Sequence, residues 1–185
     1  MGHHTAPPIS YDADYWAEYV ARDRTPMGEA LTQARLQLVN RHAPETTCID
    51  IGIGGGLFVE RSGAHGYDVN PEAVQWLKRR GSYRHPESLG PQTLTFWDSL
   101  EHIPDPVRMV QCAKQWVAVS MPIYESAEAV LSSPHYKPGE HLWYWTHEGL
   151  IQWFRRRGFE CREHNTMETI LGRRGIHSYM FERVG

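Results

Sequence analysis

Short apolar runs alternate with amphipathic stretches along the chain. The runs at residues 48–51, 93–97 and 117–121 have the length of strands and are mostly apolar, as expected for strands covered on both faces of a parallel sheet. Between them, a helix-capping residue followed by proline occurs at positions 70–71 and 105–106. This alternation predicts right-handed βαβ units and therefore an α/β fold around a parallel sheet.

The two ends of the sequence complete this pattern. Residues 159–166 and 176–184 predict an antiparallel pair that closes the sheet. Residues 1–45 are expected to form an N-terminal arm and leading helices, and residues 46–185 a single compact domain. A further strand is expected within residues 82–89, where the hydrophobic pattern is weak.

Three tyrosines near the N-terminus recur at helical spacing. Tyr11, Tyr15 and Tyr19 are four residues apart, which places them on one face of a helix. Such a face either packs against the core or forms a lid whose hydroxyl groups cover a ligand. The sequence leaves both interpretations open.

Composition narrows the class of protein. The 185 residues carry a net charge of −3, which gives no general attraction to nucleic acid or to an anionic membrane. The three cysteines are scattered without metal-type spacing, which indicates a reducing compartment. No apolar run approaches the ~18 residues of a membrane span, and the N-terminus has no apolar signal core. We therefore expect a cytoplasmic protein.

A glycine-rich turn with an acid on either side suggests a nucleoside site. Gly52, Gly54 and Gly56 follow the first predicted strand, where they let the backbone turn sharply and approach a ligand. The helix after them is expected to direct unpaired N–H groups at the turn. Asp50 precedes the glycines, and Asp68 ends the next strand, where a carboxylate can bind a ribose diol. We expect an adenosine-containing cofactor.

The pattern Asp50-x-Gly52-x-Gly54-x-Gly56 differs from the dinucleotide fingerprint, whose last glycine would fall on Leu57. It resembles motif I of the class I S-adenosylmethionine-dependent methyltransferases. The resemblance implies a Rossmann-like, doubly wound, mostly parallel seven-stranded sheet with a closing antiparallel strand, and S-adenosylmethionine as cofactor. It implies that Asp50 orients the loop or the cofactor's amino group and that Asp68 binds the ribose. Further cofactor contacts are expected from the glycines and from Tyr15, Val69, Trp97 and Asp98.

A second segment of the same resemblance follows the fourth predicted strand. Leu100-Glu101-His102 and the Pro-Asp-Pro sequence at 104–106 are similar to a segment found in many small-molecule methyltransferases. His102 is the candidate catalytic base, with Glu101 to orient it. The pair could instead contribute to a metal site or only begin the next loop. Two adjacent residues supply too few ligands for a metal, so we predict no metal site from the sequence.

The aromatic segment at residues 123–145 is expected to form a long loop and is the candidate acceptor site. It either packs on the core or forms a wall of the substrate pocket, and we favour the wall because its aromatic side chains can stack on a planar acceptor. The residues assigned to substrate binding are Tyr124, Tyr136, His141 and Trp143.

The acceptor class is narrowed by what the sequence lacks. Residues 97–100 read Trp-Asp-Ser-Leu, where DNA amino-methyltransferases have an Asp- or Asn-Pro-Pro-aromatic motif. We therefore expect a small-molecule or nucleotide-like acceptor methylated on oxygen or nitrogen. Two other functions remain open: a non-catalytic cofactor-binding protein of the same fold, and a related enzyme of aminopropyl transfer or decarboxylation. The sequence does not predict the oligomeric state.

Overall fold

The computed structural model describes residues 2–3 and 11–185. Most of the predicted N-terminal arm lies outside these residues. The helices are α1 (Ala13–Asp23), α2 (Pro26–His42), α3 (Leu57–Ser62), α4 (Pro71–Arg79), α5 (Pro86–Leu89), the 3-10 helix η1 (Leu100–His102), α6 (Pro106–Val110), α7 (Ala127–Leu131), α8 (His147–Arg155) and α9 (Met167–Ile170). The strands are β1 (Gly2–His3), β2 (Cys48–Ile51), β3 (His65–Tyr67), β4 (Thr93–Trp97), β5 (Trp116–Tyr124), β6 (Trp143–Thr146), β7 (Phe159–Asn165) and β8 (Ile176–Arg183).

Strands β2 to β8 form one mixed sheet, and the two-residue β1 extends it beside β6. Strands β3, β2, β4 and β5 are parallel neighbours in that order, and β6 continues the parallel pairing at the end of β5. Strand β8 runs antiparallel between β5 and β7. The predicted α/β class, with its mostly parallel sheet and closing antiparallel strand, is confirmed.

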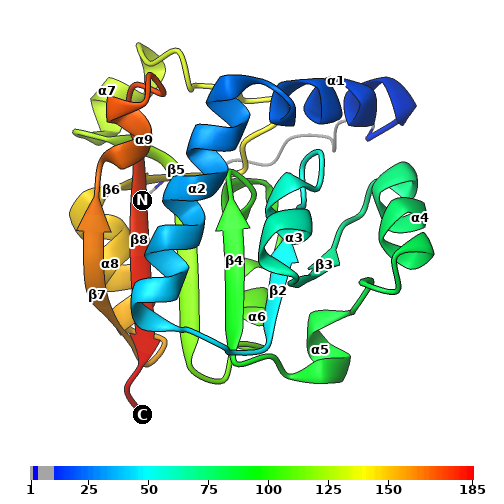
Figure 1. Cartoon of the computed structure of the whole chain (residues 1–185). Coiled ribbons are helices and arrows are strands. Elements are labelled where there is room, and N and C mark those ends of the chain that lie inside the picture. Colours follow the sequence, from blue (N-terminus) through cyan, green and yellow to red (C-terminus); the bar gives the residue numbers. More distant parts are fainter. Residues whose placement is uncertain (1, 4–10) are drawn as a thin grey trace.

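Helices cover both faces of this sheet, and the side chains of β4 show why. Phe96 packs on one face with Phe154 of α8, whereas its neighbour Trp97 packs on the other with Leu38 of α2 and Phe58 of α3. Alternate residues of a strand point to opposite faces, so β4, whose five residues are all buried, is covered by helices on both sides. Figure 1 shows α2 and α3 on the near face and α6 and α8 on the far face.

Two local predictions differ from the structure. In residues 82–89, only a single bridge joins Tyr83 to Gly66, and helix α5 follows. His85, which accepts a hydrogen bond from the backbone N–H of Glu87, and the proline after it start a helix where a strand was expected. The segment 123–145 is also more ordered than a loop, since it contains the end of β5, helix α7 and the start of β6.

Helix α1 lies beyond the arrowhead of β4, at the carboxyl end of the parallel strands (Figure 1). This is the edge at which open α/β sheets bind their ligands. None of the helices in the described part of the chain combines the length and the apolar character that crossing a bilayer requires.

Candidate functional site

A cavity of about 800 Å³ lies at the carboxyl edge of the sheet. Its volume falls within the ~300–1,000 Å³ typical of small-molecule sites. The glycine loop, α1, the end of β3, the turn after β4 and the segment before β6 all contribute to its wall. The lining residues are Tyr11, Tyr15, Trp16, Tyr19, Ile51, Gly52, Gly54, Tyr67, Asp68, Val69, Asn70, Trp97, Asp98, Ser99, His102, Ile103, Pro104, Met109, Gly139, Glu140 and Leu142.

The glycine loop is shaped by positions that accept no side chain. Gly52 has φ of +73°, and a Cβ there would lie 2.7 Å from the Cβ of Ser99. Gly56 has φ of +89°, and a Cβ there would lie 2.7 Å from the ring of Trp76. Both conformations favour glycine, and both close contacts exclude a larger residue. Gly52 and Gly54 line the cavity, whereas Gly56 is not among the lining residues.

Asp50 lies outside the cavity lining. Its side chain is 1% exposed, and its Oδ1 accepts a hydrogen bond of 2.6 Å from the Thr95 hydroxyl. Burial raises the pKa of Asp50 to about 7, although the bond from Thr95 favours the charged form. In this environment the Asp50 side chain can support the glycine loop, but it does not line the cavity in which a ligand would lie.

Asp68 lies at the wall of the cavity, at the predicted position. Its Oδ2 accepts a hydrogen bond from the Ile53 backbone N–H at 2.9 Å, and its Oδ1 accepts one from Asn70 at 2.8 Å. These bonds hold the carboxylate between the glycine loop and the start of α4. A carboxylate oxygen accepts more than one hydrogen bond, so both oxygens can still bind a ribose diol.

Helix α1 is joined to the glycine loop by a contact that sequence reasoning missed. Asp23 Oδ2 accepts a hydrogen bond of 3.0 Å from the Leu57 backbone N–H at the start of α3. The expectation that this N–H is open to a ligand is therefore wrong. A Cβ on Gly55 would lie 2.6 Å from both Asp23 Oδ2 and the carbonyl oxygen of Tyr19, which shows how closely α1 packs on the loop.

The predicted tyrosines do face the cavity. Tyr11, Tyr15 and Tyr19 all line it, and the hydroxyls of Tyr15 and Tyr19 are hydrogen-bonded at 3.1 Å. Burial is the main cause that raises the pKa of Tyr11 to about 12, so its hydroxyl stays protonated and can donate. Of the two interpretations of this face, its place in the cavity wall favours the lid.

Asp98 lines the cavity but already has partners. Arg173 binds it with two hydrogen bonds of 2.6 and 3.0 Å, and Arg35 adds one of 3.1 Å. Both arginines also bind Glu168, which is 1% exposed. Burial opposes ionisation of Asp98, but the two arginines outweigh it and hold the pKa of this carboxyl below its usual range. The sequence held no signal for this four-residue network, because its members come from α2, α9 and two loops.

Trp97 and Val69, the other predicted cofactor contacts, also line the cavity. Trp97 is buried and lies 5.3 Å below the guanidinium of Arg35. Val69 is 65% exposed, which is unusual for a large apolar side chain and leaves it available to cover a planar ring.

His102 lines the cavity from η1, after β4, and the fold brings two further predicted residues beside it. Glu101 and His141 are 2% and 5% exposed. The rings of His102 and His141 meet edge to face, with centroids 4.8 Å apart. Burial lowers the pKa of both imidazoles, to about 3 for His141, so each ring is neutral at physiological pH.

None of the four residues predicted to bind the acceptor, including His141 beside His102, is among the lining residues. Tyr124 donates a hydrogen bond to the His135 carbonyl, Tyr136 packs on Tyr144, and Trp143 donates to the carbonyl of Ile103. Their assignment to substrate binding stays a prediction. Instead, the backbone before β6 reaches the cavity at Gly139, Glu140 and Leu142, which have no distinctive pattern in the sequence.

A family model described as a methyltransferase domain matches residues 19–164. The match spans most of the chain, and the protein therefore belongs to the methyltransferase-domain family. The predicted resemblance is thus confirmed at the level of a methyltransferase domain, while the particular motif stays a prediction. No curated protein matches the sequence.

Solved structures share this fold at low sequence identity. One is a possible histamine N-methyltransferase from Thermotoga maritima, with 17% identity, a TM-score of 0.63 and coverage of 92% of this chain and 97% of that one. Another is magnesium protoporphyrin IX methyltransferase from Synechocystis with bound S-adenosylhomocysteine, with 14% identity, a TM-score of 0.58 and coverage of 91% and 92%. The [4+2]-cyclase SpnF is also similar, with 15% identity, a TM-score of 0.59 and coverage of 100% and 99%.

Proposed function

We propose that this protein transfers the methyl group of S-adenosylmethionine to a small-molecule acceptor. The observation that carries the proposal is one continuous cavity that is lined by Asp68 and the glycine loop, after β3 and β2, and by His102, after the neighbouring strand β4. A cofactor and an acceptor need such adjoining halves to react in line. When bound, S-adenosylmethionine supplies an already activated methyl group on its sulfonium.

The residues present fit this cofactor. Gly52 and Gly54 leave the loop bare of side chains where it meets the cavity, and Asp68 offers two oriented carboxylate oxygens for a ribose diol. Val69 and Trp97 provide apolar surface for the adenine and the methionine chain, and Tyr15 covers the opening. Asp50 supports the loop from beneath.

On the acceptor side, the chain supplies a neutral imidazole. A hydrogen bond of 3.0 Å joins His102 Nδ1 to the Glu140 carbonyl, which requires the proton on Nδ1 and leaves Nε2 unprotonated. Nε2 can then take the proton that an O–H or N–H acceptor loses as its new bond to carbon forms. It can alternatively ligate a metal, but a nitrogen cannot do both at once.

The enclosed, aromatic wall favours a planar acceptor of small size. Tyr11, Trp16 and Tyr19 line the cavity beside apolar Ile103 and Met109. Aromatic stacking contributes about 0.5–1.5 kcal/mol per pair beyond the burial of area. A nucleotide-like acceptor also fits this chemistry, and no feature of the wall selects it over other planar molecules.

The test is methyl transfer from labelled S-adenosylmethionine to a panel of planar hydroxyl and amine compounds, with S-adenosylhomocysteine measured by mass spectrometry. We expect labelled product, and a rate lowered by roughly 10²–10⁴ in His102→Ala if Nε2 is the base. His147→Ala, which lies outside the cavity, is the control. Failure to bind either form of the cofactor in calorimetry, or tight binding of NAD in its place, would reject the proposal. Binding without turnover would support a non-methylating function.

A further inference from the structure

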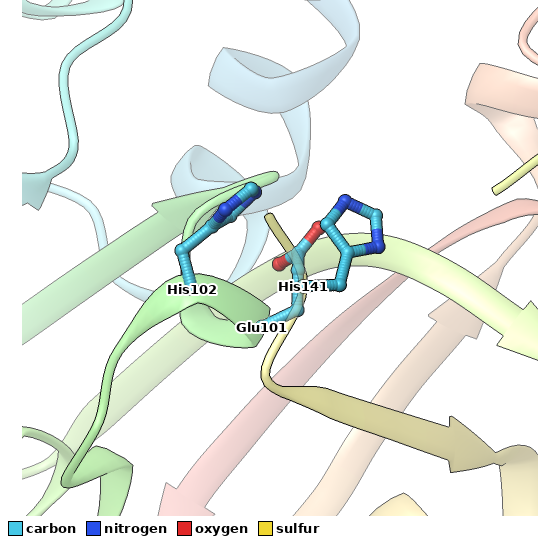
Figure 2. A group of neighbouring side chains, drawn as sticks. All are labelled: Glu101, His102 and His141. Atoms are coloured by element: carbon cyan, nitrogen blue, oxygen red, sulfur yellow. The ribbon is translucent and has the colours of Figure 1, made fainter. Parts of the chain in front are cut away.

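Glu101, His102 and His141 form a cluster that the fold assembles from two distant segments. The first two belong to η1, and His141 precedes β6. One nitrogen or oxygen atom of each side chain lies within 4.8 Å of those of the other two. Figure 2 shows the Glu101 carboxylate between the two imidazole rings. The backbone N–H of Leu142 donates to the Glu101 carbonyl at 2.8 Å, which fixes the two segments side by side.

The Glu101 carboxylate is buried without a partner. Neither of its oxygens has a hydrogen bond from any described residue, and the side chain is almost fully enclosed. An ionised carboxylate in this position loses its hydration, and no neighbouring side chain in the described part of the chain donates a hydrogen bond to replace it. Burial and the nearby Asp98 accordingly raise its pKa well above the ordinary value. A bound cation is the simplest group that would complete its environment.

The two histidines are prepared as neutral ligands. In His102 the Nδ1 proton is held by the Glu140 carbonyl, so the lone pair of Nε2 is available. Imidazoles that ligate metals commonly donate their other N–H to a backbone carbonyl in this way, because the bond fixes the tautomer and the ring orientation. The ring of His141 has no hydrogen bond to any other described side chain or backbone group, so it too can offer a lone pair.

We propose that Glu101, His102 and His141 bind a divalent transition-metal ion, with Zn²⁺ as the best match. Two imidazoles and one carboxylate are a known three-ligand set for zinc, and they leave a fourth position open. Ca²⁺ and Mg²⁺ prefer oxygen ligands throughout, so two imidazoles disfavour them. Bonds of ~2.0–2.2 Å bring tetrahedral ligand atoms closer than 4.8 Å, and rotation of the three side chains toward a common centre achieves this.

The site would adjoin the acceptor half of the cavity, since His102 and Glu140 line that wall. Its open position would then take an oxygen of the acceptor. This consequence rests on the proposed function and makes the acceptor more specific. The acceptor would be a molecule with a hydroxyl or carboxylate oxygen near the methylated atom. The ion would also tie the segment before β6 to η1, closing that side of the cavity.

The experiment is a titration of chelator-treated, tag-free protein with Zn²⁺ and with Co²⁺, without cofactor or acceptor. We expect one ion per chain by calorimetry, and visible absorption bands of Co²⁺ in a four-coordinate site. Glu101→Gln should weaken Zn²⁺ binding by more than ~10²-fold, since loss of even an outer-shell partner costs 10–100-fold. His164→Asn combined with His177→Asn is the matched control, because these two histidines are hydrogen-bonded to each other outside the cluster.

Binding of S-adenosylhomocysteine by each variant shows that it is folded and separates the two proposals. The metal site is overturned if the wild type binds no Zn²⁺, if Glu101→Gln binds it equally well, or if the double histidine variant is the one that loses it. Should Glu101→Gln fail to fold, His102→Ala at the partly exposed ligand must show the same loss of Zn²⁺. Normal zinc binding without any cofactor affinity would reject the methyltransferase proposal and leave the metal site standing.

Discussion

At the scale of single residues, two acids from one motif have different environments. Asp68 faces the cavity and is held by two backbone N–H groups, whereas Asp50 is buried beneath the glycine loop. Asp68 was expected to bind the ribose, and Asp50 to orient either the loop or the cofactor's amino group. In the proposed function Asp68 is the direct ligand and Asp50 a supporting residue, because a group enclosed by protein reaches a ligand only through what surrounds it.

Replacing Asp68 with asparagine should weaken cofactor binding selectively. The amide keeps one accepting oxygen, and so one of the two backbone bonds, and it loses the negative charge that strengthens bonds to a diol, a difference of about 1.5–3 kcal/mol. Calorimetric titration with S-adenosylhomocysteine measures this change. Glu72→Gln, at an acid in the first turn of α4 that does not line the cavity, is the control and should bind normally. Unaltered affinity in Asp68→Asn would exclude Asp68 as the ribose ligand.

At the scale of elements, α1 is docked on the loop that it helps to cover. Its last residue, Asp23, accepts the hydrogen bond from Leu57, and Gly55 leaves no room between helix and loop. The helix itself buries no residue completely, and at its other end the Asn70 side chain at the start of α4 donates to the Asp12 carbonyl. A cover that is held at its ends and buries little surface can open and close over a bound molecule.

Two substitutions should displace α1 for independent reasons. Asp23→Ala removes the bond to Leu57 and should lower stability by about 1 kcal/mol. Gly55→Ala places a methyl group 2.6 Å from the Tyr19 carbonyl oxygen and should push the helix away. Both should weaken S-adenosylhomocysteine binding and speed proteolysis within α1. Glu18→Ala, on the exposed face of α1, should change neither, and equal behaviour of all three variants would contradict the docking role.

At the scale of the whole molecule, the free energy of unfolding depends on pH through two acids whose pKa values are shifted in opposite directions. Hydrogen bonding by Arg41 lowers the pKa of Glu163 to about 2, so the stability that this pair contributes is lost as pH falls from about 4.5 toward 2. Asp50 acts in the other direction. Its folded pKa of about 7 exceeds the unfolded value of 3.8, so the folded state binds more protons between these limits and loses stability as pH rises.

The Asp50→Asn variant should therefore gain stability relative to the wild type as pH rises from about 4 to about 7. The slope of that difference is at most about 1.36 kcal/mol per pH unit for one proton. Urea denaturation at a series of pH values measures it. Asp14→Asn, an exposed acid on α1, should show no such gain. A flat difference between wild type and Asp50→Asn would mean that Asp50 ionises normally in the folded protein.

The sequence by itself determined the architecture and the part of the cavity that we propose for the cofactor. Apolar runs, caps and turn glycines act between near neighbours, so 48–70 could be interpreted locally as strand, loop, helix and acid. The short helix α5, which forms where a strand was expected, shows the limit of local interpretation. Its hydrophobic pattern is weak, and only the cap at His85 and the proline after it indicate a helix. The part of the cavity proposed for the acceptor depended on tertiary structure. Residues far apart in sequence meet there and nearby: His141 lies beside Glu101, Asp23 is hydrogen-bonded to Leu57, and Glu168 joins a network of charged side chains. Only packing of the whole sheet brings these residues together.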